Sequence, residues 1–114
     1  IAAFKVTYFC PENFYSIANS TGGDGSTRMC EVADRHGIPQ EICSINRCVL
    51  GAHLAGELPE PALFISANTP CDGNHAGNTI VRELAKCPQF SVGGAYDRSP
   101  ETIKVWARSV WELR

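Results

Sequence analysis

Cys71 lies in a stretch that is typical of a strand-to-helix junction. The sequence N-T-P-C-D-G-N at positions 68–74 follows the apolar run from Ala62 to Ala67 and precedes an amphipathic segment. In an α/β fold, such a junction lies at the carboxyl edge of the sheet, where these folds bind ligands. The N-terminal end of the following helix stabilises a thiolate. Cys71 is therefore the first candidate for a chemically active residue.

Cys43 is the second candidate, because it also lies near a predicted helix start. Pro39-Gln40-Glu41 is predicted to begin a helix that runs to about Ala55, with Cys43 in its first turn. In a parallel α/β domain, helix starts that follow strands share one edge of the sheet, so these two thiolates can meet there. Paired thiolates select soft metals and iron–sulfur clusters. Geometry alone favours the alternative of two unrelated buried cysteines.

The elements that must position these cysteines follow from hydrophobic periodicity and from helix start and stop signals. The predicted order is strand, helix, helix, strand, helix, strand, helix, with the first strand at Ala2 to Cys10, a loop at Ser20 to Thr27 and a short helical segment at Cys30 to His36. This order predicts an α/β domain with a mainly parallel sheet in a Rossmann-like three-layer arrangement, with Cys43 and Cys71 at the carboxyl edge of the sheet. Residues 1–114 are expected to form one domain.

Composition narrows the possible function classes. The chain has 114 residues, a net charge of -2 and six cysteines. A slightly negative net charge does not indicate nucleic-acid binding, and no apolar run is long enough to span a membrane. With no visible secretory signal, we expect a cytoplasmic protein whose cysteines are reduced. Most of the six are expected to be small buried residues.

The order of several short motifs resembles the 2-hydroxyacyl-CoA dehydratase and benzoyl-CoA reductase family, and in particular its D-component. Positions 39–47 read P-Q-E-I-C-S-I-N-R, similar to the family's P-x-x-x-C-S-x-x-R helix start, and C-D-G-N at 71–74 is similar to its later C-D-G/A turn. Pro11-Glu12, Pro88-Gln89-Phe90 and Tyr96-Asp97 resemble the family's first helix start, short strand and aromatic loop. The resemblance covers essentially the whole chain.

The resemblance implies a [4Fe-4S] cluster held by three cysteines, of which Cys43 and Cys71 match the first two. The third ligand of the family lies far downstream, so the chain is expected to be a first-domain fragment that is inactive alone, or to receive that ligand from another chain. The implied partners are a paralogous second subunit, an ATP-dependent iron–sulfur activator and an acyl-CoA substrate. The implied reaction is radical dehydration of a 2-hydroxyacyl-CoA by one-electron reduction of its thioester.

Other residues near these motifs have chemical and structural interpretations. Cys48 can replace Cys43 as a ligand if the helix starts later, and Cys10 can face the site or be a buried thiol. His75 can donate to the cluster region or face solvent. Arg47 can balance the charge of the cluster or of a CoA phosphate, or form a surface ion pair. The remaining case is Asp72, which can simply cap the helix after Cys71.

Three alternatives remain open at this stage. The chain can belong to a benzoyl-CoA reductase-type subunit, which reduces an aromatic ring instead of removing a hydroxyl group. It can be a non-catalytic cluster-binding partner subunit, or a metal-free α/β domain with structural cysteines. The sequence also predicts that the final helix, with Trp106 and Trp111, exposes apolar surface.

Overall fold

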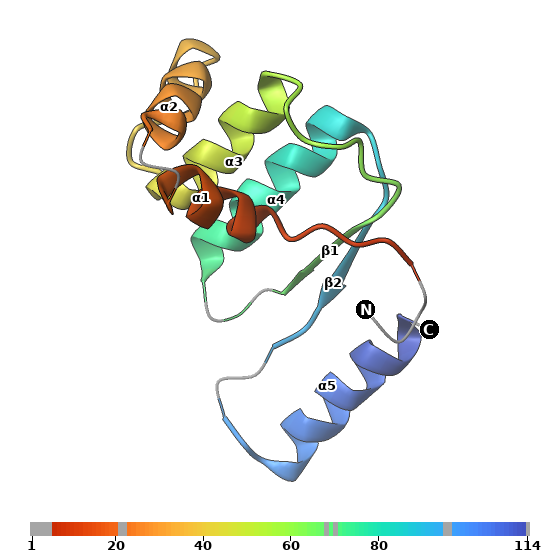
Figure 1. The fold of residues 1–114 in the computed structure, drawn as a ribbon. Helices are drawn as coiled ribbons and strands as arrows, with labels where there is room; N and C mark the ends of the chain where they lie inside the picture. The colour runs from red at the N-terminus through yellow and green to blue at the C-terminus, as the bar shows by residue number, and fades with distance from the viewer. Residues whose placement is uncertain (1–5, 21–22, 68, 70, 95–96, 114) are drawn as a thin grey trace. The chain divides into compact units, whose positions relative to one another are not determined.

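The computed structural model describes residues 6–20, 23–67, 69, 71–94 and 97–113. Their contacts divide the chain into two compact units, Ile1–Glu57 and Leu58–Arg114. The elements of Figure 1 are the helices and strands α1 (Pro11–Ser20), α2 (Gly25–Arg35), α3 (Ser44–Leu54), β1 (Phe64–Ala67), α4 (Asp72–Ala85), β2 (Gln89–Val92) and α5 (Pro100–Glu112). No helix in the described part of the chain is long and apolar enough to cross a membrane.

The first unit is built from α1, α2 and α3, with α2 packed along α3 (Figure 1). Its most buried side chains come from these last two helices and are Met29, Ala33, Cys48, Val49, Leu50 and Ala52. Gly51 allows the two backbones to approach closely: a Cβ there would lie 2.6 Å from the carbonyl carbon of Met29 and closer still to its oxygen. The packing of the first unit therefore depends on a small residue at one position of α3.

The second unit contains a βαβ arrangement. β1 and β2 pair in parallel, with Phe64 opposite Gln89 and Ala67 opposite Val92, and α4 connects them. α4 packs on β1, and Val81 is its most buried apolar side chain. Parallel strands require such a crossover connection, and a helix supplies it. Cys71 follows β1 at the carboxyl end of the strand, as predicted.

The chain segments after the two strands also lie against each other. The side chain of Thr69 occupies the space in front of Gly94, where any Cβ would overlap it. Gly94 therefore allows the segment after β2 to approach the segment that leads to Cys71. A larger residue at Gly94 would have to displace Thr69, two residues before Cys71.

The predicted apolar surface of the final helix is present. α5 begins as expected at a proline after the cap Ser99, whose hydroxyl accepts a hydrogen bond from the Thr102 amide at 3.3 Å. The large side chains of α5 are mostly exposed, with exposed fractions of 56% for Ile103, 51% for Trp106 and 68% for Trp111. Within the described residues, α5 buries none of its side chains.

Three predictions about the first unit are wrong. Residues 6–10, the described part of the predicted strand from Ala2 to Cys10, form no strand, and residues 1–5 lie outside the described part. The predicted loop from Ser20 to Thr27 ends earlier than expected, because α2 begins at Gly25. α2 is therefore longer than the helical segment that was expected to begin at Cys30. The helix expected from Pro39 begins at Ser44, because residues 39–42 form a turn closed by a hydrogen bond from the Ile42 amide to the Pro39 carbonyl (3.2 Å).

The fold class is confirmed only as mixed α/β. The described residues form five helices and a parallel sheet of two strands. The predicted Rossmann-like three-layer arrangement requires a larger sheet than these two strands provide. That all 114 residues form one domain stays a prediction.

Candidate functional site

Cys43 occupies the N-cap of α3 and not the first helical turn as predicted. Its backbone is extended, with φ -47° and ψ 134°, and its side chain makes no capping hydrogen bond. The residue is exposed. Cys43 therefore offers an accessible sulfur at the N-terminal end of α3.

Cys71 occupies the equivalent position of α4. Its sulfur accepts a hydrogen bond from the amide of Asn74 at 3.4 Å, so the thiol itself caps the helix. Asp72 is the first helical residue and not the cap that the sequence suggested; its carboxylate complements the dipole from the first turn. Like Cys43, Cys71 is exposed. Both predicted ligands therefore have an accessible sulfur at a helix start.

The two cysteines belong to different units, Cys43 to the first and Cys71 to the second. Within the described residues, no group of three His, Cys, Asp or Glu side chains is arranged to hold a metal ion. Each of the two predicted ligands is therefore described within its own unit.

The other four cysteines are less accessible. Cys48 alone of the six is fully buried, so the prediction that most of the cysteines are small buried residues is wrong. Burial, with a smaller contribution from the nearby Cys30, raises the pKa of Cys48 to about 11. Burial also raises the pKa of Cys30 above its ordinary value, against an opposing effect of Arg47. Because Cys48 faces the helix packing, it is a poor replacement for Cys43 as a ligand.

Removing Cys71 is expected to weaken α4, whereas removing Cys43 leaves α3 nearly unaffected. Cys71→Ala deletes the acceptor for the Asn74 amide and is expected to lower the free energy of unfolding by about 0.5–1 kcal/mol. Cys71→Ser keeps an acceptor and is expected to retain most of that stability. Cys43→Ala is the matched control, because Cys43 makes no capping bond. Urea unfolding of the reduced, metal-free protein measures all three, and equal losses at both positions would contradict the assignment.

The buried thiol of Cys48 predicts a loss of stability in alkali. Its pKa is about 11 in the folded protein against an ordinary value of 9.0. Between these values the unfolded chain releases the proton and the folded chain keeps it, so stability is full below about 9 and falls as pH rises towards 11. The fall is on the order of 2 kcal/mol. Urea unfolding across this range should show a shallower pH slope in Cys48→Ala; identical slopes would refute the prediction.

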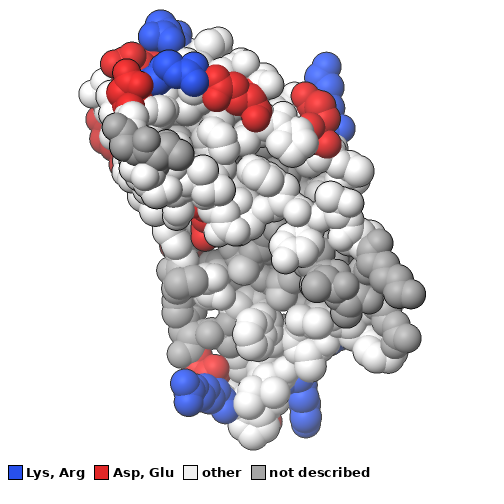
Figure 2. All heavy atoms as spheres, in the orientation of Figure 1, with Lys and Arg blue, Asp and Glu red and all other residues white. Residues whose placement is uncertain are grey.

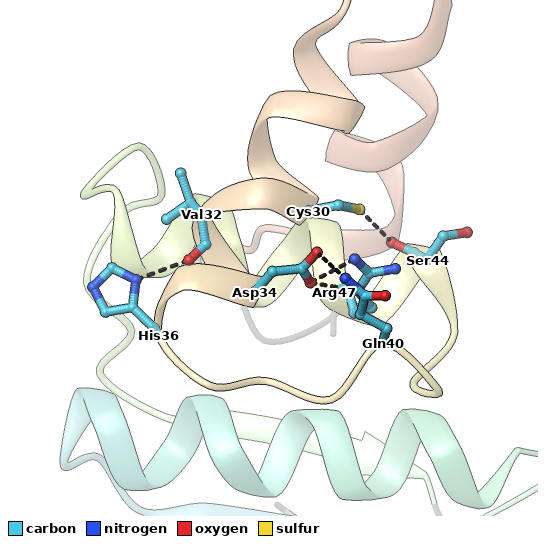
Figure 3. A network of polar contacts seen from close by, with 7 residues as sticks. All are labelled: Cys30, Val32, Asp34, His36, Gln40, Ser44 and Arg47. Carbon is cyan, nitrogen blue, oxygen red and sulfur yellow. Dashed lines mark hydrogen bonds and ion pairs between the residues drawn. The ribbon is translucent and has the colours of Figure 1, made fainter.

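The residues around Cys43 join a network that the sequence did not predict (Figure 3). The carboxylate of Asp34 on α2 accepts hydrogen bonds from Arg47 Nε (3.1 Å), Arg47 Nη2 (2.5 Å) and Gln40 Nε2 (3.1 Å). One turn earlier on α2, the thiol of Cys30 donates to the Ser44 carbonyl at 3.6 Å. The hydrogen bond to Asp34 raises the pKa of the Arg47 guanidinium. Of the roles considered for Arg47, the ion pair is confirmed.

An open cavity of about 420 Å³ adjoins this network. Its lining includes Cys30, Glu31, Asp34, Ser44 and Arg47. On the face drawn in Figure 2, acidic and basic side chains lie side by side over the helices of the first unit. The Arg28–Glu57 ion pair at 2.8 Å is an example from this unit.

A sequence signal for Asp34 existed in its spacing of four residues from Cys30, which places both on one face of a helix.

His75 lies in the second unit, one helical turn after Cys71. Its amide donates to the Cys71 carbonyl at 3.2 Å, and its ring is half-buried rather than fully exposed. The Nδ1 atom is buried and has no hydrogen-bond partner among the described residues. The Nδ1 atom of His75 does not face solvent, contrary to the interpretation of His75 as a solvent-facing residue.

Comparisons with known proteins identify one family. The family model described as 2-hydroxyglutaryl-CoA dehydratase, D-component, matches residues 7–114. Comparisons with curated proteins and with solved structures give no match. The match covers nearly the entire chain and includes both helix-capping cysteines.

Proposed function

Because this chain belongs to the 2-hydroxyglutaryl-CoA dehydratase D-component family, we propose that it is an iron–sulfur subunit, or part of one, of a 2-hydroxyacyl-CoA dehydratase. The reaction is the dehydration of a 2-hydroxyacyl-CoA to an enoyl-CoA. The observation that carries this proposal is the family match over residues 7–114, which confirms the resemblance inferred from the motifs. It supports an enzyme component of the dehydratase type.

Cys43 and Cys71 are the residues that would hold a [4Fe-4S] cluster. Both thiols are exposed and each lies at a helix N-terminus, and cysteine thiolates are the usual protein ligands of iron–sulfur clusters. The donor set is therefore chemically suited to the group. Since no three His, Cys, Asp or Glu side chains of the described residues are grouped to hold a metal ion, the remaining protein ligand would come from another part of the protein or from a partner.

A cluster held by Cys43 and Cys71 would supply low-potential electrons for one-electron reduction of the substrate thioester carbonyl, which would make loss of an unactivated hydroxyl group possible. The residues of this chain have simpler tasks: two thiolates fix the group, and two helix N-termini stabilise its negative charge. The proposed partners are a paralogous second subunit, an ATP-dependent activator and the acyl-CoA. A benzoyl-CoA reductase-type reaction uses the same ligands, so the choice of substrate separates the two reactions.

The proposal is tested on the complete enzyme, prepared without oxygen. Iron and acid-labile sulfide are measured together with the visible spectrum, and turnover of 2-hydroxyacyl-CoA and aromatic acyl-CoA is followed with activator, ATP and partner subunit. A brown, iron-containing enzyme that forms enoyl-CoA is the expected result. A colourless enzyme that dehydrates the substrate at full rate would overturn the cluster assignment. Ring reduction without dehydration would establish the reductase reaction instead.

A further inference from the structure

The segment that carries Cys43 has little regular structure of its own. Residues 39–43 belong to neither helix nor strand, and the Cys43 side chain makes no capping hydrogen bond. The Ile42 amide closes one turn, and the Arg47 amide donates to the Cys43 carbonyl at 3.0 Å. Such a segment requires contacts from outside itself to hold one conformation.

Asp34 supplies these contacts on both sides of Cys43. Its Oδ2 accepts from Gln40, three residues before the cysteine, and its Oδ1 accepts from Arg47, four residues after it (Figure 3). The carboxylate therefore links the turn that enters α3 with the first turn of that helix. A single side chain of α2 restrains the backbone on either side of the thiol.

The surroundings make this link stronger than an ordinary surface ion pair. The Arg47 side chain is only 16% exposed and that of Asp34 26%, so water screens the pair weakly. Two nitrogens of the Arg47 guanidinium donate to the same carboxylate oxygen, Oδ1, and such charge-assisted hydrogen bonds are stronger than neutral ones. Cys30, on the same face of α2, adds its hydrogen bond to the Ser44 carbonyl.

We infer that Asp34 is a positioning residue for Cys43, which holds the thiol at the N-cap of α3 through Gln40 and Arg47. The inference rests on the proposed function, in which Cys43 is a cluster ligand. It assigns Arg47 a structural task within the chain, because its guanidinium is committed to Asp34. It also gives Gln40 a role in orienting the site, although its side chain is exposed on the surface.

Hydrogen exchange tests the restraint without any cluster. In Asp34→Ala, amides of residues 40–47 are expected to exchange about tenfold faster or more, since the charged hydrogen bonds that hold this segment are lost. Glu31→Gln is the matched control, because Glu31 lies on the same helix and lines the same cavity but is outside the network of Figure 3. Unchanged exchange in folded Asp34→Ala would overturn the inference.

The electron paramagnetic resonance spectrum of the reduced complete enzyme tests the consequence for the ligand. Asp34→Ala is expected to alter the g values or to lower the cluster content, whereas Glu31→Gln changes neither. The double variant Asp34→Arg with Arg47→Glu swaps the two charges of the ion pair. It is expected to restore the g values and the cluster content at least partly, because the Gln40 amide group can donate or accept a hydrogen bond. Faster amide hydrogen exchange in Asp34→Ala with an unchanged electron paramagnetic resonance spectrum would contradict the positioning role, because Asp34 would then stabilise the segment without affecting the ligand.

The two arms separate this inference from the proposed function. If the unmodified enzyme contains no iron, the proposed function fails, while hydrogen exchange still decides whether Asp34 restrains Cys43. If circular dichroism shows that Asp34→Ala is unfolded, Asp34→Asn keeps the shape of the side chain and removes its charge. Normal exchange and a normal spectrum in Asp34→Asn would then overturn the inference.

Discussion

Cys43→Ala and Cys71→Ala are each expected to lower the iron and sulfide content of the complete enzyme at least about tenfold. Loss of a ligand should exceed the effect of losing a group that only supports one, for which 10- to 100-fold losses are typical. Both thiols are exposed N-caps, so alanine at either position removes a donor without opening a cavity in a core. Anaerobic iron analysis, sulfide analysis and the visible spectrum measure the effect.

The chain offers controls for both units. Cys10→Ala in the first unit and Cys87→Ala in the second change half-buried thiols outside the proposed site and should leave the iron content unchanged. Cys48→Ala tests the alternative ligand; its buried position predicts a normal cluster. Cluster content that is unaffected by changes at both Cys43 and Cys71 would exclude the ligand assignment. A loss confined to Cys48→Ala would transfer the role to that residue.

Gly51→Ala is expected to cause the largest loss of stability. The new Cβ would overlap the Met29 carbonyl group, which is backbone and cannot rotate away. The clash must separate α2 from α3, which together form the core of the first unit. Overpacking of this kind typically costs about 1–3 kcal/mol, and we expect a loss of about 3 kcal/mol or more because the contact is to a backbone. Urea unfolding followed by circular dichroism measures it.

Gly25→Ala is the matched control for this prediction. Gly25 is also helical, but a Cβ there meets only Ala18 atoms at 3.7 and 3.8 Å, which is ordinary contact. Alanine also has the higher helix propensity, by about 1 kcal/mol in a helix interior, so this variant should be as stable as the unmodified protein or slightly more so. Equal stability of Gly51→Ala and Gly25→Ala would show that the two helices can separate at no cost.

Local signals in the sequence succeeded where the structure depends on near neighbours. α1 begins at Pro11 and α5 at Pro100, each with an acidic residue in its first turn, as predicted. The strand before Cys71 and the helix after it were also correct. Caps, prolines and first-turn charges act within a few residues, so the sequence itself contains the information.

The same reasoning failed where distant contacts decide. The aromatic and β-branched residues of 6–10 favour a strand, but a strand also needs a partner, and the described residues give them none. Pro39-Gln40-Glu41 looks like a helix start, yet Gln40 is bound to Asp34 and the helix begins at Ser44. Propensity is a weak preference that tertiary contacts override.

The sequence by itself determined that Cys71 lies at a helix start, because the signals there are local, and its motifs identified the family; it began the helix near Cys43 too early. Only the tertiary structure showed that both thiols are exposed N-caps and that Cys48 is buried. The tertiary structure alone also showed that Asp34 binds residues on both sides of Cys43, since this depends on how α2 packs along α3. Burial and hydrogen bonds between distant residues arise from that packing, and a linear pattern does not contain them.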